Sequence, residues 1–110
     1  MTQHANVLGV LARGDDIFDA LGDGRRRRIL ALLAEEPRSI TQLADILPVS
    51  RPAVSKHLNK LRSVGLVAHE VQGTSHVYRL HDTGFVQAHA YLDEFWDVAL
   101  ARFKIAAENL

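Results

Sequence analysis

The sequence predicts a mainly α-helical fold with one small β-hairpin. Apolar residues recur at helical spacing through four segments that precede Gly65. Directly after Gly65 the pattern becomes strand-like and is interrupted by one polar turn. A long final segment returns to helical spacing and is rich in aromatic side chains. With 110 residues, 47% of them hydrophobic, the chain suits one modest domain.

The first two helices are expected over residues 15–21 and 25–35. In the first, Ile17, Phe18 and Leu21 fall on one side, which is typical of an amphipathic helix. The second has a broad apolar face and stops before Pro37. Residues 1–14 carry little pattern, so we expect an N-terminal tail there and a single domain over residues 15–110.

Two further helices are joined by a tight turn. Ser39 and Gln42 have the spacing of a capping box, which starts the third helix. Pro48 ends that helix, and Ser50 caps the fourth. Gly65 then provides the left-handed residue that closes a helix. Two short helices with a turn of this kind between them indicate a helix-turn-helix.

A hairpin follows this pair of helices directly. Strands are expected over Leu66–Val71 and His76–Leu80, with a turn over Gln72–Ser75. Asp82 or Thr83 is expected to cap the last helix. The predicted fold is therefore a winged helix-turn-helix with a long C-terminal helix.

Charge is unevenly distributed, although the formal net charge is zero. Residues 1–23 have a net charge of −3, residues 24–81 of +6, and residues 82–110 of −3. A basic centre is suited to the phosphates of a nucleic acid, while the acidic ends would face another partner. Ordinary scatter of surface charge is the alternative.

The fourth helix has the pattern of a DNA-reading helix. Val54, Leu58 and Leu61 form its apolar stripe, and no acidic residue occurs from Ser50 to Val67. A basic helix of this kind fits the major groove, where its first turns read base edges. A solvated surface helix is the alternative. The residues predicted to contact DNA here are Ser50, Arg51, Pro52, Ser55, Lys56, His57, Asn59 and Lys60.

Two other segments are candidates for DNA contact. Four arginines, Arg25–Arg28, begin the second helix and oppose its dipole, so either phosphates or the aspartates at positions 15, 16, 19 and 23 should offset their charge. Arg26 represents this run among the predicted DNA contacts. On the hairpin, Thr74, Ser75 and Arg79 suit contact with the backbone or minor groove, and an ordinary turn is the alternative.

The last helix has too much apolar surface for a helix that packs on one small core. Burial against a second copy of the chain would solve this, and the first helix could join the interface. A purely intramolecular core is the alternative. The residues predicted at the dimer interface are Phe18, Leu21, Tyr91, Leu92, Phe95, Trp96, Leu100 and Phe103.

Residues 17–103 resemble the ArsR/SmtB family of winged-helix repressors. The resemblance rests on IFDALGDGRRRRILALL, on ITQLADILPVSRPAVSKHLNKLRSVGLV, on the hairpin VAHEVQGTSHVYRL and on the final aromatic helix. SRPAVSKHLNKL is its most specific part. The resemblance implies a dimer built from the first and last helices, DNA reading by residues 50–60, and release of DNA on an inducing signal.

The chain departs from that family in its metal-sensing residues. Many members hold a metal through a cysteine pair in the third helix, where this chain reads TQLADIL without cysteine. Others use Asp and His ligands of the last helix, and here His89 and Asp93 are spaced to share a metal. A third ligand and the family's spacing are missing, so we predict neither a metal site nor a cofactor. The chain resembles the branch without the cysteine site.

Several classes of function are excluded by the sequence. The absence of cysteine excludes disulfides and thiolate metal sites, no apolar run approaches the length of a membrane span, and no secretion signal is evident. No nucleophile–base arrangement or phosphate-binding loop supports an enzyme. We therefore expect a cytoplasmic, homodimeric repressor that binds double-stranded operator DNA. The alternatives are a metal sensor that uses the last helix, and a winged-helix protein-interaction module.

Overall fold

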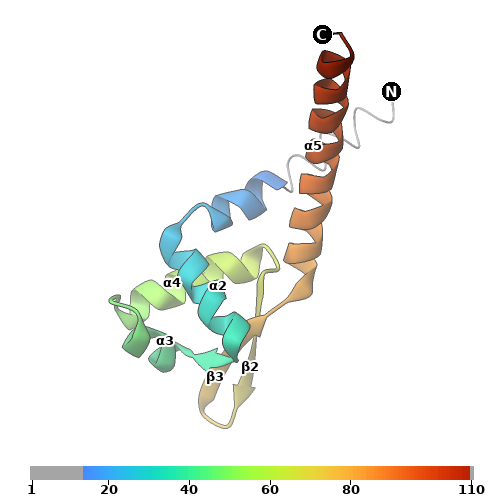
Figure 1. The fold of residues 1–110 in the computed structure, drawn as a ribbon. Helices are drawn as coiled ribbons and strands as arrows, with labels where there is room; N and C mark the ends of the chain where they lie inside the picture. Colours follow the sequence, from blue (N-terminus) through green and yellow to red (C-terminus); the bar gives the residue numbers. More distant parts are fainter. Residues whose placement is uncertain (1–13, 110) are drawn as a thin grey trace.

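The computed structural model describes residues 14–109, so the predicted tail lies outside the described residues except for Gly14, which is already helical. A first helix spans residues 14–21. The chain continues through α2 (Gly24–Glu35), β1 (Arg38–Ser39), α3 (Ile40–Ile46), α4 (Arg51–Ser63), β2 (Val67–Gln72), β3 (Ser75–Leu80) and α5 (Asp82–Glu108). Figure 1 shows α2, α3, α4 and the sheet as one body, from which α5 projects.

The core of this body lies between α2, α3, α4 and the sheet. Each helix contributes the apolar stripe predicted from its spacing, because burial of such a stripe removes apolar surface from water. No polar or charged residue is buried among residues 14–109. The core includes Ile17, Ala20, Ile29, Leu30, Leu33, Leu43, Val54, Leu58, Leu61, Leu66, Val67 and Tyr78.

The predicted helix boundaries of the central motif are confirmed by local hydrogen bonds. Ser39 and Gln42 form the capping box, with Gln42 N donating to Ser39 Oγ at 3.2 Å and Ser39 N donating to Gln42 Oε1 at 2.8 Å. Ser50 Oγ accepts from Ala53 N at 3.3 Å and caps α4. Gly65 has φ +76°, the left-handed conformation expected after a helix end.

The sheet has one strand more than the sequence predicted. It is antiparallel with the order β1-β3-β2, and β1 pairs Arg38 with Tyr78 and Ser39 with Val77. A two-residue strand has no alternation to detect, so only its pairing with β3 reveals it. The hairpin turn is also shorter than predicted, because β2 and β3 extend to Gln72 and Ser75.

The start of α5 differs from the prediction by one residue. His81, and not Asp82 or Thr83, is the N-cap, and its Nδ1 accepts a hydrogen bond from Thr83 N at 3.3 Å. The prediction considered only the usual hydroxyl and carboxylate caps, and an imidazole nitrogen with a free lone pair serves equally as an acceptor.

The long helix makes the molecule elongated. The radius of gyration is 17.9 Å and the principal extents are 61 × 32 × 20 Å, whereas a compact chain of this length has a radius near roughly 13 Å. Within α5 only Gly84 and Ala88 are buried. No helix in the described part of the chain combines the length and apolar character that a membrane span needs.

Candidate nucleic-acid interface

Helix α4 presents two chemically different faces. Val54, Leu58 and Leu61 are fully buried and hold the helix against the body. Arg51, Pro52, Lys56 and Asn59 are exposed, whereas Ser55 and His57 are half-buried on the flanks. This arrangement matches the predicted orientation of the helix. The exposed face is therefore basic and polar over three helical turns.

Two basic residues near the end of α4 have partners inside the protein. Lys60 Nζ lies 3.1 Å from Asp19 Oδ2 and joins α4 to the first helix. Arg62 Nη1 lies 2.9 Å from His69 Nδ1 and joins α4 to β2. Both side chains thus help to position the recognition helix. The free basic groups of α4 are concentrated toward its N-terminal half.

The hairpin carries a chain of hydrogen-bonded rings. Because a guanidinium can only donate, His69 Nδ1 accepts from Arg62, and its Nε2 donates to His76 Nδ1 at 3.0 Å. The two rings stack with centroids 5.2 Å apart. This contact fits the register, since His69 pairs with Tyr78 and His76 pairs with Val71. The wing is therefore attached to the end of α4 by side chains as well as by backbone.

The predicted wing contacts have unequal surroundings. Thr74 is in the turn and Ser75 begins β3, and both are exposed. Arg79, by contrast, forms an ion pair with Glu70 across the strands. The tip of the wing is thus free for contact, while Arg79 is engaged with a carboxylate of its own hairpin.

The arginine run divides into side chains that point inward and side chains that do not. Arg26 donates to the carbonyl oxygens of Ala20 at 2.6 Å and Asp19 at 3.0 Å. Arg27 donates to the carbonyl of Leu21 at 2.8 Å. These carbonyls end the first helix, so cations there satisfy orphan acceptors and complement the helix dipole. Arg26, our predicted DNA contact, is thus occupied within the protein.

Asp23 offsets the arginine charge as an N-cap. Its carboxylate accepts from the backbone N–H groups of Arg25 and Arg26, at 2.8 and 3.3 Å. The hydrogen bond from Arg25 N, helped by that from Arg26 N and by the charges of Arg26 and His57, lowers the pKa of Asp23 below its usual value, against a smaller effect of desolvation. The predicted offset by an aspartate is therefore met at the backbone.

A small pocket lies between the start of α2 and the helix-turn-helix. Its volume is about 180 Å³, and its rim includes Arg25 and Arg28 of α2 and His57 of α4. Ile29 and the turn residues 47–49 complete the lining. Arg25 and Arg28 were absent from the predicted DNA contacts. The i, i+4, i+7 spacing of Arg26, Leu30 and Leu33 was the signal that Arg26 faces inward.

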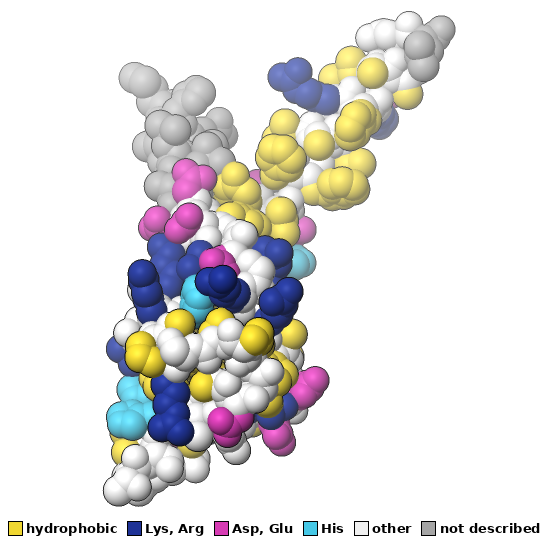
Figure 2. Space-filling view, turned by 90° about the vertical axis from the view of Figure 1, so that its left-hand side faces the viewer, with side chains coloured by type: hydrophobic (Ala, Val, Ile, Leu, Met, Phe, Trp, Pro, Cys, Tyr) yellow, Lys and Arg dark blue, Asp and Glu magenta, His cyan; other side chains and the backbone are white. Residues whose placement is uncertain are grey.

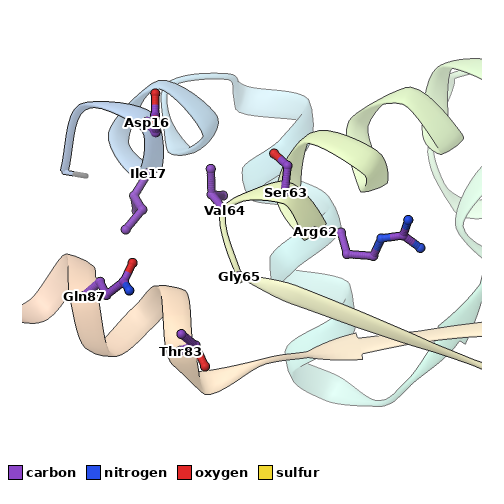
Figure 3. A pocket seen from close by; sticks show the side chains of 8 residues that line it. All are labelled: Asp16, Ile17, Arg62, Ser63, Val64, Gly65, Thr83 and Gln87. Atoms are coloured by element: carbon purple, nitrogen blue, oxygen red, sulfur yellow. The ribbon is translucent and has the colours of Figure 1, made fainter. Parts of the chain in front are cut away.

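A second, larger cavity lies at the junction of the first helix, the end of α4 and the start of α5. It has a volume of about 400 Å³. Figure 3 shows that Ile17 and Gln87 point toward each other across it, whereas Asp16 and Arg62 point away. Its charged lining residues do not converge, so this cavity offers less to a charged ligand than the pocket at α2.

The predicted dimer residues gather where the first helix meets α5. Phe18 and Tyr91 have ring centroids 5.1 Å apart, and a groove of about 250 Å³ runs between them, Leu92 and Phe95. Farther along α5, Phe95, Trp96 and Phe103 are 65%, 59% and 67% exposed. Leu21 is half-buried beside this region, and Leu92 and Leu100 are exposed.

Charge and apolar surface therefore occupy different parts of the molecule. In Figure 2 the Lys and Arg side chains gather on the body, and hydrophobic side chains follow one another along the projecting helix. The candidate metal ligands lie on that helix, with His89 Nδ1 3.2 Å from Asp93 Oδ2. Among the described residues no cluster of three or more His, Asp or Glu ligands is present.

Comparison with protein families and sequences gives one consistent result. Residues 23–69 match the model of the bacterial regulatory protein, arsR family. The chain is 45% identical over 89 residues to the HTH-type transcriptional regulator Rv2034 of Mycobacterium tuberculosis, an alignment that covers 81% of this chain and 83% of that protein.

Solved structures agree with this result. The fold is similar to an ArsR-like transcriptional regulator from Rhodococcus sp. RHA1, with a TM-score of 0.75, 36% identity and coverage of 90% of this chain and 96% of that one. It is also similar to a domain from Mycobacterium bovis described as a homodimeric winged helix-turn-helix DNA-binding domain. For that domain the TM-score is 0.63 and the identity 30%, with coverage of 94% of this chain and 91% of the other.

Proposed function

The chain belongs to the ArsR family of bacterial transcriptional regulators and has their winged helix-turn-helix fold; from this premise we propose that it is a homodimeric repressor of operator DNA in the cytoplasm. Two copies would join through the first helix and α5. Helix α4 of each copy would enter a major groove, and the wing tip would contact the flanking backbone. Membership of a family of regulators also agrees with the expectation that the chain is not an enzyme.

The exposed face of α4 is the observation that carries this proposal. Arg51, Lys56 and Asn59 point away from the buried stripe, and no acidic residue interrupts the segment from Ser50 to Val67. Arg and Lys pair with phosphates or guanine, and Asn pairs with adenine. Their position on the first turns of a helix held by the core matches the geometry of base reading.

The apolar surface of α5 supports the second copy. Exposed aromatic side chains of this size are unusual on an isolated monomer, because each leaves a large apolar area in water. The groove between Phe18 and Phe95 extends that surface onto the first helix. A similar fold is described as homodimeric. A twofold axis through this surface would leave both α4 helices free.

This symmetry determines the kind of operator. Two recognition helices related by a twofold axis fit half-sites one DNA turn apart, roughly 34 Å. The operator should therefore be near-palindromic. Bound across a promoter, such a dimer would block transcription, and a signal that favours the free protein would relieve the block.

Neither alternative function gains a specific observation. A metal sensor would need a third ligand near His89 and Asp93, and the described part of the chain brings none to them. A protein-interaction module has no need of a basic recognition face.

Selection of bound duplexes from a random pool would test the proposal directly. We expect a near-palindromic site whose affinity falls steeply as salt rises, because phosphate contacts release counterions. The selection should be repeated with zinc or nickel. Affinity that stays in the millimolar range at low salt for every duplex would contradict the proposal.

Substitution of Lys56 by alanine tests the recognition face. Lys56→Ala should weaken binding to the selected operator by about tenfold or more, since one good base or phosphate contact contributes about 1–3 kcal/mol. Arg51→Ala should act in the same way. Affinity is measured by fluorescence anisotropy.

Lys104→Ala is the matched control, because it removes the same charge from an exposed position near the end of α5. This variant should bind operator as the unaltered protein does. Equal losses for Lys56→Ala and Lys104→Ala would mean that only overall charge matters, and that α4 does not read DNA.

A further inference from the structure

Arg25 and Arg28 differ from the other two arginines of their run. Both are exposed, and among residues 14–109 their guanidinium groups have no ion pair or hydrogen bond, whereas Arg26 and Arg27 donate to carbonyl oxygens of the first helix. Residues three apart lie on the same side of a helix. Two free guanidinium groups therefore share one side of α2.

These guanidinium groups meet α4 at a defined place. The pocket of about 180 Å³ is lined by Arg25 and Arg28, by His57 from the recognition helix, and by the turn that joins α3 to α4. Its floor is apolar, with Ile29, Leu47 and Val49. An apolar floor lowers the local dielectric and so strengthens hydrogen bonds to a charged group.

We propose that this site, the arginine pocket, binds one phosphate of the DNA backbone beside the groove that α4 enters. Guanidinium groups bind phosphates through paired N–H donors, and an imidazole N–H adds a further donor. The volume lies below the roughly 300–1,000 Å³ of most small-molecule sites, and it suits one phosphate group. This inference rests on the proposed function.

The pocket gives the phosphate a positioning role. Its lining comes from α2, from the turn and from α4, so one bound phosphate would hold three parts of the reading head in a single orientation. Contacts of this kind carry no sequence information, but they determine the register of the recognition helix on the duplex. The loss should therefore be similar for operator and for unrelated DNA.

The test compares the double variant Arg25→Ala/Arg28→Ala with Arg27→Ala. Arg27 lies in the same turn, and its guanidinium faces the carbonyl of Leu21. We expect the double variant to lose about ten- to a hundredfold in affinity for operator and for random duplex. Its slope of log affinity against log salt should fall by about two, one for each lost phosphate contact. Arg27→Ala should keep the slope of the unaltered protein.

Phosphate ethylation provides the direct reading. In the unaltered protein, ethylation of one phosphate beside each half-site should block binding, and in the double variant that interference should disappear. Thermal denaturation confirms that all three proteins are folded. Unaltered protein that binds operator, together with a double variant of unchanged slope and interference, would overturn the arginine pocket and leave the proposed function intact. Absence of any operator binding by the unaltered protein would overturn both.

A free anion is the other source of the same chemistry. Inorganic phosphate is titrated into the protein without DNA while the ring resonances of His57 are followed by NMR. Saturation at low millimolar phosphate that is lost in the double variant, with DNA affinity unchanged, would assign the pocket to a small anion and overturn the proposal. A His57 shift on addition of operator that is lost in the double variant supports it.

Discussion

Asp23 links the first helix, α2 and the recognition helix through one carboxylate. It accepts two backbone N–H groups at the start of α2, and the charges of Arg26 and His57 also favour its ionised form. The adjacent Arg26 donates to the end of the first helix. A single turn of chain therefore satisfies the orphan donors of one helix and the orphan acceptors of another.

The lowered pKa of Asp23 predicts a pH-dependent effect of its removal. A carboxyl with a depressed pKa in the folded state contributes stability above its ordinary value of 3.8, and this is lost as pH falls through the folded value. Asp23→Ala should lower the Tm by a few degrees at neutral pH, and the difference should shrink in acid. Circular dichroism melts from neutral to acid pH measure it. Asp23→Asn, which keeps an acceptor, should lose less, and a difference that does not vary with pH would contradict the charge argument.

At the scale of elements, the junction of α4, β2 and α5 depends on two glycines. Gly65 adopts φ +76°, and Gly84 N donates to its carbonyl at 2.8 Å. A Cβ on Gly84 would lie 2.6 Å from the carbonyl oxygen of Val64 and 2.7 Å from the carbonyl carbon of Gly65. Backbone atoms cannot move aside as a side chain does, so α5 can leave the body in this direction only if position 84 is glycine.

Gly84→Ala should therefore destabilise the protein, by about 1–3 kcal/mol, which is typical of overpacking. Urea unfolding followed by circular dichroism measures the change. Gly73→Asn is the control, because nothing lies within 4 Å of a Cβ there and Asn tolerates φ +63°. If Gly84→Ala unfolds at the same urea concentration as the control, the packing argument is wrong.

At the scale of the whole molecule, the projecting helix explains why a monomer is an incomplete object. Only two residues of α5 are buried, and its aromatic side chains are more than half exposed along a helix of 27 residues. The basic face lies on the body, away from this helix (Figure 2). Apolar association and phosphate binding can thus occur together without competing for surface.

Trp96→Ala should weaken the proposed dimer by about 2–4 kcal/mol, since a buried tryptophan is a typical interface hot spot. Sedimentation equilibrium over a dilution series measures the dissociation constant. Ile46→Ala, which removes an exposed apolar side chain from α3, should leave it unchanged. An unchanged dissociation constant for Trp96→Ala would remove α5 from the interface.

Local rules in the sequence predicted most of the fold. The capping box at Ser39, the cap at Ser50 and the closing glycine at position 65 are interactions within a few residues, so neighbours in the chain suffice to specify them. The buried stripe of α4 follows equally from spacing. The strand β1 escaped prediction because two residues carry no period, and the His81 cap because imidazoles are uncommon caps.

The sequence by itself determined the fold class, the two faces of α4 and the apolar excess of the last helix, because periodicity and caps act over short distances. Only the tertiary structure decided which basic side chains are free. Arg26, Lys60 and Arg79 were predicted to contact DNA, yet each has a partner in another segment, while Arg25 and Arg28 meet His57 across a pocket. A long cation is directed by acceptors distant in the chain, and their positions are known only when helices and strands have packed.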